Sequence, residues 1–369
     1  MHVLSATHDL DTPTVSDLLT GIADRAGAWL TRRRSPDGIG FGLCEGSIVP
    51  VELNATTAGV ELWVALGLPL TAQERVSWIE HLAAYQLERT GLVVDRTWRG
   101  RQLVANPRQR SDGDTFFTMT TTAALDALGG QLRYPVRYLA EASVRDLEAA
   151  VSWEWLAHAP FGVGDFGPLV LHNTRLAVPG AAEQWSWVNE MLVRTQDPSG
   201  FWPVGTIAGP ITPHINRAFH VLRASWNLSG RPIERAESLI DACLIAGDDP
   251  TFYGWDTGFA CNDLDLAHVA YSAARWTDHR RDELADWARR LLARVLAVEK
   301  PGGGFSFFHE TAMEAHAGIA MSGRRPKADM WGTLMYLGAI KMTAELGWPE
   351  VKAPWAFSKV HAVPEGGRR

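Results

Sequence analysis

The stretch that decides the fold of this 369-residue chain is residues 196–202, QDPSGFW, followed directly by a proline. Apolar residues recur with helical spacing before it, over 181–196, and after it, over 213–228. Gly200 permits the left-handed turn at a helix end, and an aromatic side chain two residues later folds back over the junction. The stretch therefore predicts a joint between consecutive helices.

Three weaker copies of this joint occur along the chain. They read EKPGGGF at 299–305, RSPDGIGF at 34–41 and QLERTG at 86–91. The copies are separated by roughly one or two times fifty residues, which is the length of a two-helix unit. The spacing predicts that the helices occur in pairs.

Helical periodicity dominates the remainder of the chain. The capping box TAQE at 71–74 opens one helix, and an apolar stripe from Val15 to Leu30 marks another. Further helices are predicted at 54–66, 115–128, 141–157, 181–196, 213–228, 232–246, 263–275, 280–298 and 327–345. No stretch alternates with period two, so β structure is limited to short pairs in loops. We predict one all-α domain over residues 1–369 with its core at about 14–346.

Composition excludes several classes of partner. Forty-two acidic against 35 basic residues give a net charge of −7, whereas nucleic-acid and anionic-membrane surfaces need a concentrated basic patch. No apolar run reaches the roughly 18 residues of a membrane span, and the first residues lack a signal-peptide pattern. Three cysteines are too few for a disulfide framework. These features predict a cytoplasmic protein, and they leave its oligomeric state open.

The stretch 196–202 fits the Q-x-x-x-G-x-W repeat, and the chain resembles the terpenoid-cyclase and protein-prenyltransferase superfamily over about residues 30–345. The resemblance implies an α/α toroid of about six helical hairpins. It also implies that the Gln amide stacks on the Trp and bonds backbone at the next helix end. Inner-helix N-termini and loops would then line a central cavity. At this length we expect a single toroid.

The densest candidate site is YGWDTGFACNDLDLAH at 253–268, which joins aromatics and carboxylates at a predicted helix start. Class II terpenoid cyclases carry D-x-D-D in a comparable place. The resemblance makes Asp265 the general acid, matched together with Asp263, while Leu266 stands where the family has its last Asp. The alternative is structural, with Asp263 as the N-cap and Asp265 favoured by the helix dipole.

We expect other residues to support this acid. Asp263 or Asp256 would assist it, and His309 is a further candidate acid, base or donor, or else a solvated loop residue. Aromatic faces would stabilise cationic charge. The candidates for this role are Tyr253, Trp255, Phe259 and Trp331. Phe116 and Phe117, at another helix start, are expected to line the same cavity.

Three more residues are candidate substrate contacts. Asp329 either caps the helix that follows it or faces the cavity. Arg217, near His214, is a candidate ligand for a phosphate or carboxylate, and the alternative for Arg217 is a surface charge on a helix.

We predict no cofactor and no metal, with zinc as the alternative to weigh. The prenyltransferases bind zinc through an Asp, a Cys and a His, so Cys261 and Asp263 with His268, His309 or His316 would form the site. A free buried Cys is usually inert packing. The chain lacks DDxxD, Gly-rich phosphate-loop, GxSxG and HExxH motifs, so phosphoryl transfer and serine hydrolysis are not favoured.

The leading hypothesis is a terpenoid-cyclase-like enzyme that acts on an isoprenoid or other apolar substrate by Asp-mediated acid catalysis. A second is a carbohydrate-active toroid, a glycan lyase, epimerase or hydrolase, because Trp and Tyr stack on sugars and paired carboxylates suit their chemistry. A third is a non-catalytic toroid that binds a lipid or a partner. A closed apolar cavity favours the first hypothesis, and a cleft with Asp, His, Arg and Asn favours the second.

Overall fold

The computed structural model describes residues 10–45, 52–95, 112–150, 162–202, 211–249, 252, 260–308, 315–316, 319–320 and 327–357. Most of these residues are helical. The described strands are β1 (Ala315–His316) and β2 (Ile319–Ala320), which pair antiparallel. This agrees with the prediction that β structure is limited to short pairs in loops.

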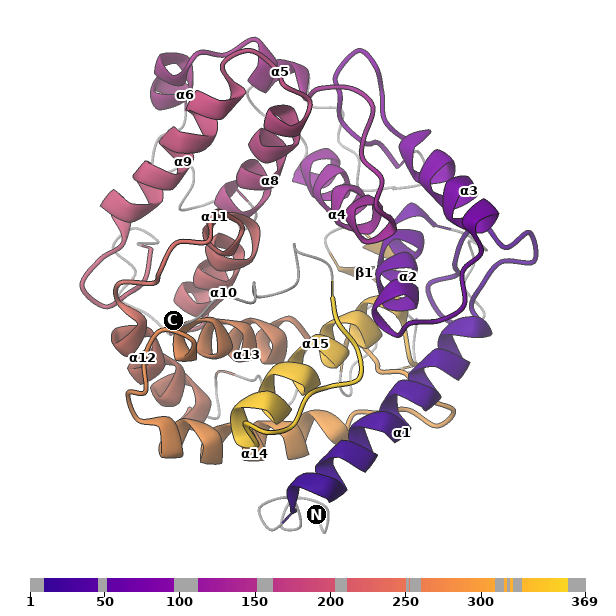
Figure 1. Cartoon of the computed structure of the whole chain (residues 1–369), viewed down its shortest axis with the longest axis vertical. Helices are drawn as coiled ribbons and strands as arrows, with labels where there is room; N and C mark the ends of the chain where they lie inside the picture. Colours follow the sequence, from indigo (N-terminus) through magenta and orange to yellow (C-terminus); the bar gives the residue numbers. More distant parts are fainter. Residues whose placement is uncertain are drawn as a thin grey trace.

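The helices form an inner and an outer layer around a ring (Figure 1). The inner helices are α2 (Leu53–Ala65), α4 (Asp112–Leu128), α8 (Gly162–Arg175), α10 (Thr212–Val221), α13 (Ala260–Ala274) and α15 (Met330–Gly347). The outer layer holds α1 (Thr12–Thr31), α3 (Ala72–Ala83), α5 (Arg137–Ala140), α6 (Val144–Ala150), α9 (Ala181–Thr195), α12 (Ala236–Asp248) and α14 (Arg281–Leu296). Each inner helix contacts the next, and α15 contacts α2, so the ring is closed. The predicted all-α fold class is confirmed.

Burial along the helices explains the two layers. In α2 every residue except Val64 is buried, including the polar Asn54 and Glu61. In α3, by contrast, only Trp78, Leu82 and Ala83 are buried. A helix buried on all sides must lie between other elements, whereas an amphipathic one covers the outside.

The four joints predicted from the sequence share one turn. In each joint, the second residue donates its backbone N–H to the carbonyl oxygen of a residue four or five positions later in the chain. In the joint at 196–202, Asp197 N donates to Phe201 O at 2.8 Å. The equivalent pairs are Ser35 with Gly40, Leu87 with Leu92, and Lys300 with Gly304. Gly200 adopts φ +85°, which disfavours any residue with a Cβ. Trp202 is fully buried beyond the turn and donates from Nε1 to Leu192 O at 2.9 Å.

The glutamine of the joint acts differently at the two places where it occurs. Gln196 donates to Gly200 O at 2.8 Å, within its own turn. Gln86 bonds Gly91 O and also reaches the next hairpin, donating to Tyr134 O at 2.6 Å and accepting from the N–H groups of Arg133 and Tyr134. The resemblance implied that the Gln of the joint bonds the next hairpin. In this structure Gln86, in one of the weaker copies, makes those hydrogen bonds, and Gln196 bonds only within its own turn.

Two helix predictions differ from the structure. Helix α8 was not predicted, because Gly162, Gly164, Gly167 and Pro168 lower its helix propensity. Burial of Leu169 and Val170 against the neighbouring inner helices offsets that propensity. The helix predicted at 141–157 begins three residues later, as α6 at Val144; a separate short helix, α5, precedes it, and residues 151–157 lie outside the described part of the chain.

The helix after α10 is irregular. A π-helical turn, η1 (Leu222–Trp226), follows it directly and leads into α11 (Asn227–Ser229). One wide turn of this kind shifts the residues after it around the helix axis. The π-helical turn lies in the wall of the ring and contains Arg223, a residue of the candidate site.

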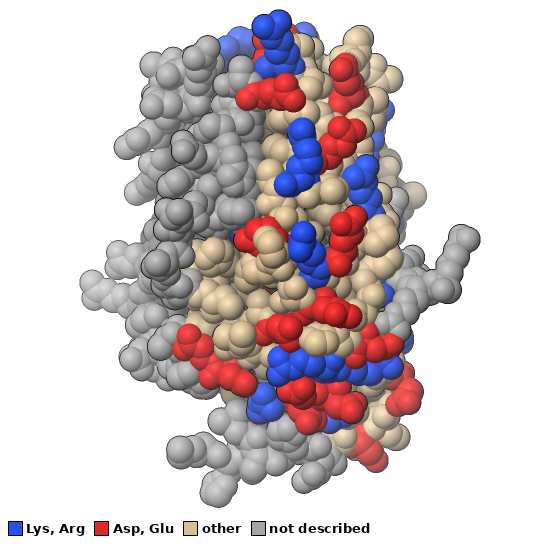
Figure 2. All heavy atoms as spheres, turned by 90° about the vertical axis from the view of Figure 1, so that its left-hand side faces the viewer, with Lys and Arg blue, Asp and Glu red and all other residues tan. Residues whose placement is uncertain are grey.

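Acidic and basic side chains are interspersed on the face shown in Figure 2. Ion pairs between partly exposed side chains include Arg280 with Asp241 and with Glu283. None of the helices in the described ranges combines the length and the apolar run that crossing a bilayer requires.

Candidate functional site

Asp265 lies on the same face of α13 as Cys261 and His268, which are four residues before and three residues after it. Its side chain is only 3% exposed. The Asn216 amide of α10, in the orientation that satisfies its neighbours, donates to Asp265 Oδ2 at 3.1 Å and to Thr212 O at 3.3 Å. Asp265 therefore faces α10, another helix of the inner layer.

The environment of Asp265 favours its neutral form. Burial raises the pKa of this carboxyl well above its usual range, and the positive charge of Arg223 opposes part of that rise. A carboxyl that stays protonated near neutral pH is able to donate a proton.

Asp263 points to a different side of the helix, since residues two apart on a helix are separated by about 200°. Its carboxylate accepts from Arg294 Nε of α14 at 3.2 Å and from Tyr336 OH of α15 at 3.0 Å. Helix α13 begins at Ala260, so the expectation that Asp263 is the N-cap is wrong. The Asp263 carboxylate therefore joins α13 to α14 and α15, and it does not lie beside the Asp265 carboxylate.

Three basic residues, Arg217, His220 and Arg223, lie along α10 and η1 at three-residue spacing. Arg217 is only 9% exposed, so the expectation of a surface charge is wrong. Burial lowers the pKa of Arg217 to about 10. Burial, together with both arginines, lowers the pKa of His220 well below its usual value.

Arg223 was not identified from the sequence. It belongs to the π-helical turn, is 5% exposed, and places Nη2 3.2 Å from Met119 Sδ of α4. Its guanidinium lies 5.0 Å from the centre of the Phe219 ring, within cation–π range. The signal available in the sequence was the spacing, because Arg223 follows His220 by three residues as His220 follows Arg217. Spacing alone, however, does not tell whether that side of the helix lies toward a cavity or toward solvent.

Two of the predicted aromatic residues are brought together. Phe116 of α4 and Trp331 of α15 stack with ring centres 5.2 Å apart and planes 27° apart. Phe117 is buried and lies edge-on to Phe116 at 5.8 Å. These helices are separated in the ring by α2, so the stacked pair joins two walls of the ring.

Asp329 is the N-cap of α15. Its carboxylate accepts from Gly332 N and from Phe307 N, both at 2.7 Å, which links the helix to the segment that follows the joint at 299–305. Burial raises its pKa to about 7, although the backbone hydrogen bonds oppose that rise. Of the two interpretations of Asp329, capping is the one that the structure shows.

Among the described residues, no hydrogen bond or ion pair joins the remaining predicted site residues to Asp265. His214 is half-buried, with its ring 5.5 Å from that of Phe201 in the joint at 196–202. The other five lie outside the described residues, and their roles stay predictions. They are Asp256, His309, Tyr253, Trp255 and Phe259.

A small cavity of about 20 Å³ lies inside the ring. Its walls carry Arg223, His268 and Trp331 beside apolar side chains from α13 and α15. That volume holds roughly one water molecule. The described lining is therefore mostly apolar with two polar exceptions, and it leaves little free space.

Within the described ranges, no three His, Cys, Asp or Glu side chains lie close enough together to hold a metal ion. The Asp263 carboxylate, which the zinc alternative requires, is engaged by Arg294 and Tyr336. Burial raises the pKa of the Cys261 thiol well above its usual value, which disfavours the thiolate that zinc binds. The His309 candidate lies outside the described residues.

No protein-family model and no curated protein sequence matches this chain. Among solved structures, the chain is similar to ent-copalyl diphosphate synthase from Streptomyces platensis, with 18% sequence identity and a TM-score of 0.40. The match covers 80% of this chain and 50% of the synthase, so the chain spans about half the length of that protein.

Proposed function

We propose that this chain is a terpenoid-cyclase-like enzyme in which Asp265 protonates an isoprenoid or other apolar substrate. The observation that carries the proposal is a carboxyl 3% exposed inside a closed ring of helices, with its pKa raised by burial. Acid catalysis on an alkene needs a protonated carboxyl in a site that excludes water. The burial of Asp265 and the upward shift of its pKa support both requirements.

The proposed step transfers one proton. The electron pair of a substrate double bond takes the proton from Asp265, forming a carbon–hydrogen bond and leaving a carbocation and the Asp265 carboxylate. The Arg223 charge stabilises that carboxylate, and the Asn216 amide donates to it. The aromatic faces of Trp331 and Phe116 stabilise the cation. Return of a proton from a neighbouring carbon to the Asp265 carboxylate then gives a neutral isomer and restores the acid.

Substrate entry requires rearrangement of the described walls. The interior cavity of about 20 Å³ is far smaller than an isoprenoid chain. Met335 and Met342 line it, and methionine side chains repack at low cost because they are unbranched. We expect binding to displace them and to change the fluorescence of the neighbouring Trp331.

The test is to incubate the protein with squalene and with geranylgeraniol and to analyse extracts for cyclised isomers. Asp265→Asn keeps the shape of the side chain but lacks the transferable proton, so product should fall at least a hundredfold. Asp241→Asn, on the outer face of α12, is the matched control and should leave turnover unchanged. Turnover by Asp265→Asn at the normal rate contradicts the proposed acid.

A carbohydrate-active function is the second candidate. Two polar side chains, Arg223 and His268, line the mostly apolar interior cavity, and Asp265, which bonds Asn216, lies on the same helix face as His268. These polar groups are the observation that favours this candidate. The test is a panel of neutral and uronate-containing oligosaccharides, with release of reducing ends or unsaturated sugars as the measurement. Turnover of a glycan but of no isoprenoid would favour this candidate over the first.

A further inference from the structure

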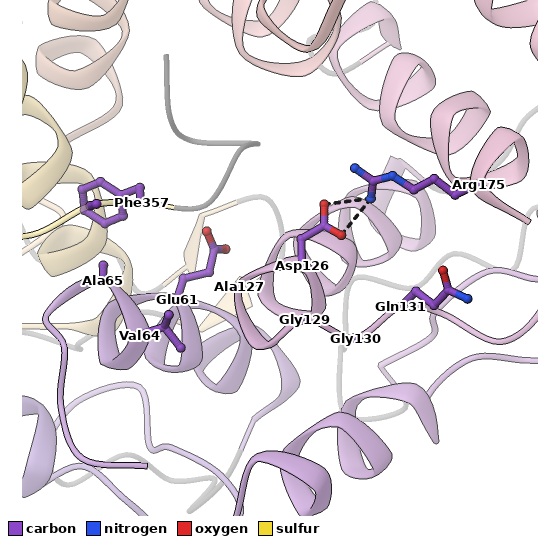
Figure 3. A pocket seen from close by; sticks show the side chains of 11 residues that line it. Glu61, Val64, Ala65, Asp126, Ala127, Gly129, Gly130, Gln131, Arg175 and Phe357 are labelled. Carbon is purple, nitrogen blue, oxygen red and sulfur yellow. Dashed lines mark hydrogen bonds and ion pairs between the residues drawn. The ribbon is translucent and has the colours of Figure 1, made fainter. Parts of the chain in front are cut away.

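A pocket larger than the interior cavity lies at the carboxyl ends of the inner helices α2, α4 and α8 (Figure 3). Its volume is about 530 Å³, whereas that of the interior cavity is about 20 Å³. Gly129 and Gln131 in its lining are exposed, so this pocket reaches the outer surface. The described residues around the interior cavity are mostly buried. One space is therefore accessible from outside, and the other lies deeper.

Phe357 lines both spaces, and among the described residues it alone does so. On the inner side its ring lies close to Gly338 of α15, where a Cβ would be 4.0 Å from Phe357 Cε2. On the outer side, Figure 3 shows the ring beside Ala65 at the end of α2, across the pocket from Arg175. The Phe357 side chain is therefore part of the wall between the larger pocket and the interior cavity.

The backbone just before Phe357 is fixed by hydrogen bonds. Trp355 Nε1 donates to Leu337 O at 3.1 Å, and Ala356 N donates to Ala65 O at 3.2 Å. Ala356 is exposed, whereas Phe357, the next residue, is buried. The chain thus holds the Phe357 ring at the boundary between the two spaces.

The Phe357 ring itself is able to move without breaking a hydrogen bond, because a phenyl ring has no polar atom. Rotation about χ1 moves it between staggered positions. Its neighbours around the interior cavity offer little resistance, since Gly338 has no side chain and Met342 is unbranched and repacks at low cost. A fixed backbone and a movable apolar ring are the two parts that a gate requires.

We propose that Phe357 is the gate of the interior site: an apolar ligand enters the larger pocket, and rotation of the Phe357 side chain admits it to the interior cavity. The proposal rests on the proposed function in one respect, namely that the interior cavity is the substrate site. Its test uses a probe that undergoes no reaction. Failure of the gate appears in binding rates and failure of Asp265 catalysis appears in turnover, so the two are distinguishable.

The probe is 1-aminoanthracene, a neutral apolar molecule whose fluorescence increases when it leaves water. Stopped-flow fluorescence on the full chain gives its association and dissociation rates, and the ratio of these rates gives Kd. Phe357→Ala should raise both rates about tenfold or more, because removal of a gate lowers the barrier to entry and to exit alike. Kd should change by less than about threefold, since the contacts beyond the gate are retained.

Ala127→Trp is the converse variant. Ala127 lines the larger pocket and not the interior cavity, so an indole there should obstruct the route and lower both rates about tenfold. Ala84→Trp, at the exposed carboxyl end of the outer helix α3, is the matched control and should bind the probe at wild-type rates.

A further variant keeps the test decisive if Phe357→Ala does not fold. Phe357→Leu retains an apolar side chain and should raise both rates several-fold. Unchanged rates in Ala127→Trp would mean that the ligand enters elsewhere, and a weaker Kd without faster association in the Phe357 variants would mean that the ring only packs. Either result, or no binding of the probe to the wild type, overturns the proposal.

Discussion

Asp263 and Asp265 are two residues apart on α13, yet their carboxylates have different partners: Asp263 binds Arg294 and Tyr336, and Asp265 faces Asn216. Because the helix turns about 200° between them, one carboxylate joins α13 to α14 and α15 while the other faces α10. The two residues should therefore respond to substitution in opposite ways.

Asp263→Ala should destabilise the fold by about 3–5 kcal/mol, because it leaves Arg294 without its buried carboxylate partner. Asp265→Asn should leave the free energy of unfolding unchanged or raise it, since a poorly solvated ionisable group is removed. Urea denaturation followed by circular dichroism measures both. A larger loss for Asp265→Asn than for Asp263→Ala would contradict this assignment.

The stability of the wild type should depend on the titration of Asp265. Its folded-state pKa is raised, so the folded state holds the proton more tightly than the unfolded state, whose pKa is about 4. Stability should then fall as the pH rises from about 4 through the folded-state pKa.

In the Asp265→Asn variant, the free energy of unfolding should decrease less between pH 4 and 8 than it does in the wild type. Asp329, whose pKa is raised to about 7, contributes equally to both proteins, so their difference isolates Asp265. Parallel pH profiles for the two proteins would mean that the Asp265 pKa is not raised.

The two glutamines of the joints should differ in their contribution to stability. Gln86→Ala removes bonds to both its own turn and the next hairpin, and should cost about 2–4 kcal/mol. Gln196→Ala removes one bond within its turn, and should cost about 0.5–1.5 kcal/mol. Chemical denaturation of the two variants side by side checks the order, and a reversed order refutes it.

Trp202→Ala should cost about 3–5 kcal/mol, as expected for truncation of a fully buried aromatic side chain. It also removes the Nε1 donor to Leu192 O. Trp185→Ala, on the same hairpin but only half-buried, serves as the comparison and should cost less. A loss below roughly 1 kcal/mol at Trp202 would mean that the motif match is accidental.

Most helices were predictable because apolar spacing and the joint signals are local. Residues 196–202 and their copies predicted turns that the structure contains, with Gly200 in the left-handed region. Helix α8 was missed for the opposite reason: its glycines and Pro168 oppose a helix locally, and only burial between other inner helices offsets them.

The sequence by itself determined that the chain is all-α, that its helices are paired, and where the joints between them lie, because these follow from spacing and turn chemistry within a few residues. Only the tertiary structure decided which of two neighbouring carboxylates faces α10 and that Arg217 is buried. It also decided that Glu61 and Phe357 line one pocket, although they lie nearly three hundred residues apart in the sequence. Burial and charge environment depend on which helices are neighbours in the closed ring, and no local pattern specifies those neighbours.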